Sequence, residues 1–235
     1  MKLKNIISSV FFPERCSICG EIMLFLKSYC PKCGIDTKII DPDACPDCGH
    51  SKCMCNSGAT AKLRHFTAVY YYEGQVKRSL HKFKFCADSS YAEIFGRAMA
   101  ERIRHVYADT NFDGICFVPM TAEAEIHRGY NQSELLALEI AKVLSIELLP
   151  CIEKTKSSLN QKSLSSKERT DNVKDSFSVT DEKAIKDKTI ILCDDIKTTG
   201  ATLKECSDTL INAGAKDVYC VCLALTPYIN YTDIF

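Results

Sequence analysis

The 235-residue sequence lacks three features that would each place it in a broad class of proteins. It has no apolar run approaching the roughly 18 residues of a transmembrane helix, so we expect no membrane insertion. Its 30 basic and 30 acidic side chains cancel, so the overall charge does not indicate a nucleic-acid-binding protein. It also contains neither a GxxxxGKS or GxxxxGKT phosphate loop nor a GxGxxG dinucleotide motif. The remaining composition, 46% hydrophobic and 26% charged, is that of a globular protein.

The first 15 residues carry two lysines and a short apolar segment, as a secretory signal does. This segment is interrupted by Asn5, Ser8 and Ser9, and no small-residue cleavage site follows it. We therefore expect a short amphipathic helix here and a cytoplasmic protein. In a reducing compartment, the 15 cysteines of the chain indicate metal ligands or core packing rather than disulfides.

Eight of the cysteines lie close together before residue 56, in four pairs. Three pairs have CxxC spacing and the fourth has CxC spacing, and together they can form two tetrahedral Cys₄ zinc sites. A segment this short buries too little apolar surface to fold without such a staple. The predicted ligands are Cys16, Cys19, Cys30, Cys33, Cys45, Cys48, Cys53 and Cys55. Sequential pairing would assign the first four to one ion and the last four to the other. A cross-brace pairing stays open, and His50 is an alternative ligand ranked below Cys53.

The rest of the chain has the pattern of an α/β domain. We expect a double zinc-ribbon domain with its helix in residues 1–58, followed by a second domain in residues 59–235. The predicted strands cover residues 66–72, 115–119, 189–193 and 217–225, and the predicted helices cover residues 75–85, 92–107 and about 202–213. Residues 120–126 are predicted to form a loop. A further helix after this loop is predicted to bury Leu135, Leu138 and Ala141 on one side.

The stretch TIILCDDIKTTGATL, residues 189–203, carries the strongest functional signal. An apolar strand is predicted to end on Asp194 and Asp195, and a loop then leads into a helix. Hydroxyls, a glycine and a helix N-terminus suit a phosphate monoester, and this loop consists of Thr198, Thr199, Gly200, Ala201 and Thr202. Two adjacent carboxylates instead suit a sugar diol or a divalent cation. A ribose 5-phosphate presents both requirements, and the motif resembles the 5-phosphoribosyl-1-pyrophosphate (PRPP) motif of type I phosphoribosyltransferases.

A second group of residues suits the pyrophosphate end of the same ligand. Arg128, Gly129, Asn131 and Gln132 combine a cation, a flexible glycine and two amides at a predicted helix entry. An exposed loop with an ordinary arginine explains these residues equally well.

Residues 74–105 are locally basic, with seven Lys or Arg against three acids. A solvated helix face explains most of this charge. Lys84 lies beside the predicted cleft and is the member that we expect to contact the ligand.

Residues 155–176 form a polar, serine-rich stretch with no apolar periodicity. A loop of this length inside a compact domain is uncommon unless it is functional or disordered. We expect a mobile flap that closes over a charged substrate. Within this flap, Arg169 would join Arg128 in neutralising the leaving pyrophosphate.

Over nearly its full length the chain resembles the ComF family, the competence-associated phosphoribosyltransferase-like proteins with an N-terminal double zinc ribbon. The resemblance rests on the eight cysteines, Lys84-Phe85, Val118-Pro119, residues 128–132, Gln161, Arg169, Asn172-Val173, Phe177 and the motif of residues 194–202. It implies a type I phosphoribosyltransferase fold, with a parallel sheet flanked by helices, and a link to DNA uptake.

Two classes of function follow from these residues. The first is an enzyme in which Mg²⁺, Asp194 and Asp195 hold the ribose of PRPP while an acceptor attacks C1. The second is a non-catalytic component of the transformation machinery that senses PRPP or handles single-stranded DNA beside a competence helicase or uptake proteins. In 6-oxopurine salvage enzymes, the position that resembles Thr198 holds an aspartate that serves as the base. The threonine here disfavours a 6-oxopurine as the acceptor. The sequence does not name another acceptor.

Overall fold

The computed structural model describes residues 16, 18–22, 30–58, 60–85, 90–155 and 176–228. Several predicted features lie outside these residues. They are the helix within residues 1–15, almost all of the flap, and the family residues Gln161, Arg169, Asn172 and Val173.

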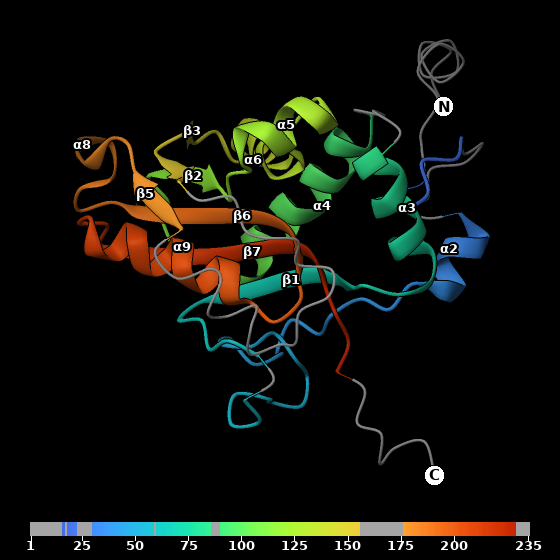
Figure 1. Ribbon diagram of the computed structural model, residues 1–235. Coiled ribbons are helices and arrows are strands. Elements are labelled where there is room, and N and C mark those ends of the chain that lie inside the picture. Colours follow the sequence, from blue (N-terminus) through green and yellow to red (C-terminus); the bar gives the residue numbers. More distant parts are fainter. Residues whose placement is uncertain are drawn as a thin grey trace, which may run out of the picture.

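A parallel sheet forms the centre of the described structure (Figure 1). Its strands lie in the order β1-β7-β6-β2-β3, and every neighbouring pair is parallel. They are β1 (Phe66–Tyr71), β2 (Gly114–Phe117), β3 (Glu147–Leu148), β6 (Thr189–Lys197) and β7 (Asp217–Leu225). The two longest strands, β6 and β7, lie side by side in the middle, and each contains an apolar run: Ile190 to Cys193 in β6 and Val218 to Leu225 in β7. Strands of this kind are buried on both faces, which requires helices on both sides.

Helices cover the two faces of the sheet unequally (Figure 1). Side chains of α3 (Gly74–Phe85), α4 (Ser90–Val106) and α6 (Gln132–Leu144) share one buried cluster with Ile191 and Cys193 of β6. Helix α9 (Ala201–Asn212) packs on the opposite face, in a cluster with Ile190 and Leu192. Alternate residues of β6 therefore enter opposite cores, as the two-residue period of a strand requires.

Five short elements complete the described structure. Strands β4 (Ile152–Lys154) and β5 (Phe177–Val179) form a separate antiparallel pair, from which the flap region leaves and to which it returns. The short helices are α2 (Pro31–Asp36), α5 (Ala122–Arg128) and α8 (Glu182–Ile185). None of the described helices has both the length and the apolar character needed to cross a membrane.

The structure corrects three sequence-based predictions. Strand β6 does not end at the carboxylates, because Ile196 still pairs with Ala224 and Lys197 with Leu225. Residues 120–126, predicted as a loop, belong largely to α5. The Thr121 side chain caps this helix by accepting a hydrogen bond from the Ala124 N–H at 3.2 Å.

The third correction concerns the buried side of α6. Leu136, Ala137 and Ile140 are fully enclosed, whereas Leu138 is 37% exposed and Leu135 is only half-buried. The helix is present as predicted and Ala141 is buried as predicted, but the buried side is centred on Leu136, Ala137 and Ile140 rather than on Leu135 and Leu138. Leucines occur on both sides of α6, so the apolar pattern alone does not define its orientation.

The cysteine-rich segment lies against the edge strand of the sheet. Ile39 forms a bridge with Tyr70 of β1, and the Arg102 guanidinium donates to the carbonyl oxygens of Ile40 and Asp41. These contacts cross the predicted boundary at residue 58. The division into residues 1–58 and 59–235 stays a prediction.

Candidate functional site

The structure brings the eight N-terminal cysteines together in two groups of four. The sulfur atoms of each group lie within 4.8 Å of one another. One group contains Cys16, Cys19, Cys30 and Cys33, and the other contains Cys45, Cys48, Cys53 and Cys55. The arrangement is therefore sequential rather than cross-braced, and His50 belongs to neither group.

Both groups fit a tetrahedral zinc ion. Four sulfurs at 2.3 Å from zinc are about 3.8 Å apart. The Cys19 and Cys30 sulfurs are 3.7 Å apart, and those of Cys45 and Cys55 are 3.8 Å apart. Burial acts to raise the pKa of Cys16, but hydrogen bonds from backbone N–H groups outweigh it and lower the pKa to about 7. Such N–H groups favour the thiolate that zinc requires.

Asp194 and Asp195 lie near the carboxyl end of β6 and are held by different partners. The Ser133 hydroxyl donates to Asp194 Oδ1 at 2.8 Å, and the Asp195 N–H donates to the same oxygen at 2.8 Å. The Lys84 ammonium forms an ion pair with Asp195 Oδ2 at 2.7 Å. The predicted association of Lys84 with this end of the sheet is therefore present in the structure. Ser133 was not among the predicted site residues.

Burial and the neighbouring Asp195 carboxylate raise the pKa of Asp194 to about 7, although the Ser133 hydroxyl and the Asp195 N–H partly oppose this. Since an unfolded Asp ionises near pH 3.9, the folded state holds an extra proton between that value and about 7. The contribution of Asp194 to stability is thus highest at low pH and falls as the pH rises through this interval.

Replacing Asp194 with asparagine is therefore expected to stabilise the ligand-free protein more at pH 8 than at pH 5. The asparagine Oδ1 can keep the hydrogen bonds from Ser133 and the Asp195 N–H. The gain at pH 8 should exceed the gain at pH 5 by about 2 kcal/mol, because between pH 5 and about 7 the folded Asp194 keeps a proton that the unfolded chain has lost. Melting curves at both pH values test this. An equal or larger gain at pH 5 would contradict it.

Residues 198–200 join the end of β6 to α9, whereas Ala201 and Thr202, predicted to lie in the loop, are the first two residues of the helix. Gly200 occupies the N-cap position with a left-handed φ of 82°, and the helix begins at Ala201. Because Gly200 has no side chain, the N-cap residue itself caps none of the first-turn N–H groups, although the Ala201 N–H donates weakly to Thr199 Oγ1 at 3.4 Å. Thr198 is exposed, and Thr199 and Thr202 are partly exposed, so their hydroxyls lie around an uncapped helix start.

The start of α6 connects the aspartates to the predicted Arg128 group. Arg128 donates to Gln132 Oε1 at 2.8 Å, and Gln132 is the neighbour of the Ser133 that holds Asp194. The Asn131 side chain accepts from the Ser133 N–H at 3.0 Å and donates to the Val118 carbonyl oxygen at 3.1 Å. Within the described residues, the buried Gln132 Nε2 has no hydrogen-bond partner. A buried donor without a partner is costly, and an acceptor that reached it would compensate for its burial.

The turn between α5 and α6 also fixes the helix that carries Lys84. The Tyr130 hydroxyl donates to the Phe83 carbonyl oxygen at the end of α3. Segments far apart in the sequence thus meet at the carboxyl end of β6. Arg169 lies outside the described residues, so its predicted place beside Arg128 stays a prediction.

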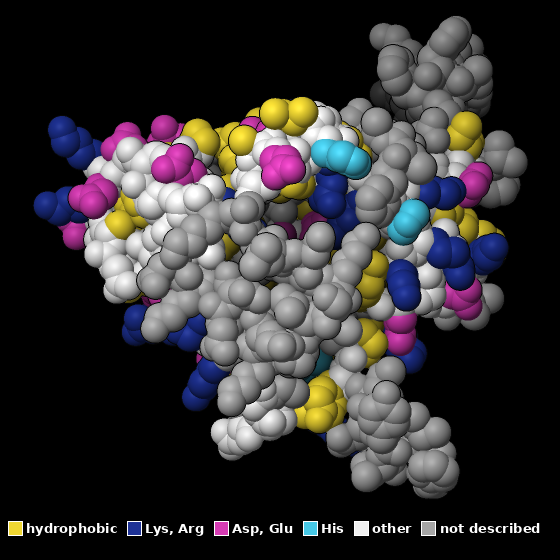
Figure 2. All heavy atoms as spheres, viewed as in Figure 1, with side chains coloured by type: hydrophobic (Ala, Val, Ile, Leu, Met, Phe, Trp, Pro, Cys, Tyr) yellow, Lys and Arg dark blue, Asp and Glu magenta, His cyan; other side chains and the backbone are white. Residues whose placement is uncertain are grey.

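The basic residues of α3 do not form a surface of a single charge. Figure 2 shows acidic and basic side chains next to one another over the end of the molecule formed by α2 and α3. Lys38 and Glu73, for example, form an ion pair of 2.9 Å there. A solvated face accounts for these residues, apart from Lys84.

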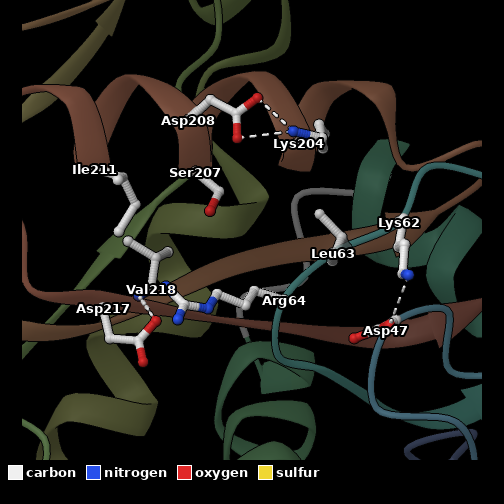
Figure 3. Close-up of a pocket in the computed structure, with 10 residues that line it drawn as sticks. All are labelled: Asp47, Lys62, Leu63, Arg64, Lys204, Ser207, Asp208, Ile211, Asp217 and Val218. Atoms are coloured by element: carbon white, nitrogen blue, oxygen red, sulfur yellow. Dashed lines mark hydrogen bonds and ion pairs between the residues drawn. The ribbon is translucent and has the colours of Figure 1, made fainter.

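A cavity of about 500 Å³ lies away from the aspartate pair, between residues 62–64 and the outer side of α9 (Figure 3). None of the predicted site residues lines it. Four of its charged side chains form two ion pairs: Lys204 with Asp208 at 2.6 Å and Lys62 with Asp47 at 3.7 Å (Figure 3). We therefore place the candidate site at the carboxyl end of β6 rather than in this cavity.

Comparison with known proteins finds a phosphoribosyltransferase domain over this part of the chain. The family model described as phosphoribosyl transferase domain matches residues 131–228, which include α6, β6, the loop and α9. The DNA utilization protein YhgH of Escherichia coli (strain K12) is 26% identical over 218 residues, covering 89% of this chain and 90% of that protein. The competence protein ComFC of Bacillus subtilis (strain 168) is 29% identical over 197 residues, covering 79% of this chain and 78% of that protein.

Among solved structures, the purine phosphoribosyltransferase from Pyrococcus horikoshii Ot3 is 20% identical. It covers 60% of this chain and 79% of its own, with a TM-score of 0.36.

The parallel sheet, the matched domain and the strand-loop-helix unit define a protein with a phosphoribosyltransferase-type domain. With its two N-terminal Cys₄ groups, the chain is similar to these DNA utilization and competence proteins along most of its length, which supports the resemblance to the ComF family.

Proposed function

We propose that the chain binds PRPP with Mg²⁺ at the carboxyl end of β6 and transfers the phosphoribosyl group to an acceptor. The observation that carries this proposal is the combination of paired carboxylates and an uncapped helix start in one strand-loop-helix unit. Asp194 and Asp195 lie on β6, and residues 198–202 lead directly into α9. Ligands of open parallel sheets bind at this end of the strands.

Each part of PRPP has complementary groups in this arrangement. The 5-phosphate would accept hydrogen bonds from the threonine hydroxyls of the loop and from the N–H groups at the start of α9. The ribose hydroxyls would donate to Asp194 and Asp195. Gln132 Nε2 and Arg128 would face the pyrophosphate, as would Arg169 in the flap.

The two aspartates also suit a magnesium ion, because carboxylate oxygens are its usual protein ligands. When bound, Mg²⁺ would neutralise charge on the pyrophosphate oxygens. Lys84 is paired with Asp195 Oδ2, so its ammonium occupies one carboxylate oxygen in the ligand-free protein. We infer that Lys84 moves toward the phosphates when the ligand enters.

The proposed reaction breaks the bond between ribose C1 and the pyrophosphate oxygen and forms a bond from C1 to the acceptor. Pyrophosphate leaves with the electron pair, and positive charge develops on the ribose ring. The protein contributes by aligning the two reactants and by holding complementary charge around them. The residues do not define the acceptor.

A second candidate is a non-catalytic role in which PRPP acts as a signal. The position of Thr198 resembles that of an aspartate that serves as the base in 6-oxopurine salvage enzymes. The exposed Thr198 side chain cannot act as a base, which favours the non-catalytic role. The names of the relatives refer to competence and DNA utilization. We accordingly propose a cytoplasmic role in DNA uptake, with single-stranded DNA or an uptake protein such as the competence helicase as partner.

Calorimetric titration of the full chain with PRPP and Mg²⁺ tests the proposal, and we expect saturable binding below millimolar concentration. Release of pyrophosphate in the presence of a panel of nucleobases then separates transfer from sensing. Failure to bind PRPP at millimolar concentration would overturn both roles for this ligand. Binding without turnover for every acceptor would favour the non-catalytic role.

A further inference from the structure

Lys197, the last residue of β6, is a buried lysine that points into the cysteine-rich segment. Its side chain is 1% exposed. The Nζ atom donates to the Thr60 hydroxyl at 2.5 Å and to the Cys48 carbonyl oxygen at 3.2 Å. It also lies 5.1 Å from the centre of the Phe66 ring. Lys197 thus bonds directly to the main chain of a predicted zinc ligand.

The surroundings of this ammonium group contain no ordinary counterion. None of the ion pairs found among the described residues includes Lys197. A buried cation is costly unless opposite charge or hydrogen bonds compensate for it. Four thiolates around one Zn²⁺ carry a net charge of −2, and Cys48 belongs to such a group. The second Cys₄ site therefore supplies the negative charge that balances Lys197.

The same lysine supports the loop that would hold the 5-phosphate. A Cβ atom added at Gly200 would lie 2.7 Å from Lys197 Cε and 3.3 Å from the Ala61 Cβ. The Ala61 N–H donates to the Thr199 carbonyl oxygen at 2.6 Å. Lys197 and residues 60–61 therefore pack against the turn formed by Thr199 and Gly200 and support it.

The first Cys₄ group lies in different surroundings. The Tyr91 hydroxyl donates to the Cys19 carbonyl oxygen at 2.7 Å, and the group shares a buried cluster with side chains of α3 and α4. The structure thus provides two metal sites on one chain, of which the second contacts Lys197 and the phosphate loop.

We propose that Lys197 is a positioning residue that couples metal occupancy of the second Cys₄ site to the shape of the phosphate loop. Zinc in the site of Cys45, Cys48, Cys53 and Cys55 holds the Cys48 carbonyl oxygen and the negative charge in place. The Cys48 carbonyl oxygen and the negative charge keep the Lys197 ammonium in position. Lys197 and Thr60 in turn support the turn at Thr199 and Gly200. Loss of this zinc releases the turn, whereas loss of the first zinc does not. The consequence for PRPP rests on the function proposed above.

The first test replaces Lys197 with methionine, which keeps an unbranched chain of similar length without the charge. Amide hydrogen exchange of residues 198–204 should become at least tenfold faster in Lys197→Met. The zinc content should stay at two ions, and exchange in β7 should be unchanged. Lys188→Met, at the opposite end of β6, is the matched control and should exchange as the wild type does. Unchanged loop exchange in a Lys197→Met protein with full zinc would overturn the coupling.

A second pair of variants tests the metal sites directly. Cys53→Ser removes an exposed ligand of the second site, and Cys30→Ser removes a half-buried ligand of the first. Each should lose one zinc, but only Cys53→Ser should accelerate exchange of the loop. If Lys197→Met does not fold, Thr60→Val removes the hydroxyl that bonds to Nζ and should give the same loop response. Equal loop exchange in the two cysteine variants would refute the proposal.

Titration with PRPP and Mg²⁺ separates this inference from the proposed function. Lys197→Met should bind PRPP at least tenfold more weakly than the wild type. A wild type that does not bind PRPP would remove the proposed ligand, whereas the exchange measurements would still decide whether the metal site and the loop are coupled. Wild-type affinity in Lys197→Met would show that the lysine does not position the loop for its ligand.

Discussion

Purified protein is expected to contain two zinc ions per chain, and their removal should unfold the cysteine-rich segment. Both sulfur groups have tetrahedral dimensions, and structural zinc contributes roughly 10 kcal/mol or more per site in zinc-finger peptides. Among the described residues of this segment, the buried side chains are those of four cysteines and of Ile18, Ile40 and His50. The apolar surface available there is too small to replace the metal.

Elemental analysis measures the zinc content, and limited proteolysis before and after chelation reports on the segment. Cleavage before Gly58 should require chelation, while the central strands β6 and β7 resist it. Cys45→Ser should reduce the zinc content to one ion. Cys151→Ala is the control, since this buried cysteine belongs to neither group and its loss should leave both ions. A zinc content near zero, together with protease resistance before Gly58, would contradict the prediction.

The sequential grouping of the cysteines illustrates what spacing can and cannot define. Each cysteine pair can be recognised in the sequence, because its CxxC or CxC spacing brings two sulfurs to one tetrahedral ion. Spacing alone left open which pairs share an ion, since that depends on how the chain folds back between them. The Cys45 and Cys55 sulfurs, 3.8 Å apart, provide that information.

The central strands were predictable because burial on both faces requires nearly continuous apolar residues. The predicted end of β6 was wrong because charged side chains were taken as the limit of the strand. Hydrogen bonding between backbones continues through Asp194 and Asp195, and only tertiary structure shows that Lys197 has buried partners. Most lysines are exposed to solvent, so the sequence predicts an exposed Lys197. Its hydrogen-bond partners lie 137 and 149 positions away, and no local sequence pattern indicates them.

Ser133 was missed for a related reason. Its local role is visible in the sequence, since Asn131 is a typical N-cap residue and Ser133 follows at the position whose N–H the cap accepts. Its hydrogen bond to Asp194 joins residues 61 positions apart, and no periodicity predicts such a contact. The strand-loop-helix unit was easier to recognise, because its carboxylates, hydroxyls and glycine are adjacent in the chain.

Thr199→Ala is expected to weaken PRPP binding by roughly 10- to 150-fold while the fold survives. Removing a hydrogen-bond donor to a charged group costs about 1.5–3 kcal/mol, which corresponds to this range. The Thr199 side chain also accepts from the Ala201 N–H at 3.4 Å, a long and therefore weak bond. If the loop were only a helix cap, the same change would lower the melting temperature and leave PRPP affinity unchanged.

Gly200→Val should have a larger effect than Thr199→Ala, for two reasons that act together. Its φ of 82° is unfavourable for any residue with a Cβ, and most unfavourable for a β-branched one. The added Cβ would also lie 2.7 Å from Lys197 Cε and would displace the lysine that supports the loop. The side chain would further occupy space where the phosphate approaches the backbone. We expect PRPP binding to fall below detection.

A glycine at the other end of α9 separates backbone strain from the effect on the site. Gly214 has a φ of 104°, and a Cβ there would meet nothing closer than the Lys186 Cγ at 3.9 Å. Gly200→Ala and Gly214→Ala should therefore each lose about 1–2 kcal/mol of stability from the left-handed backbone. Only Gly200→Ala should also lose PRPP affinity, because only there does the new atom press on Lys197. Calorimetric titration with PRPP and Mg²⁺, beside melting curves of both variants, measures the two effects. Equal affinity in the two alanine variants would mean that the loop does not hold the phosphate.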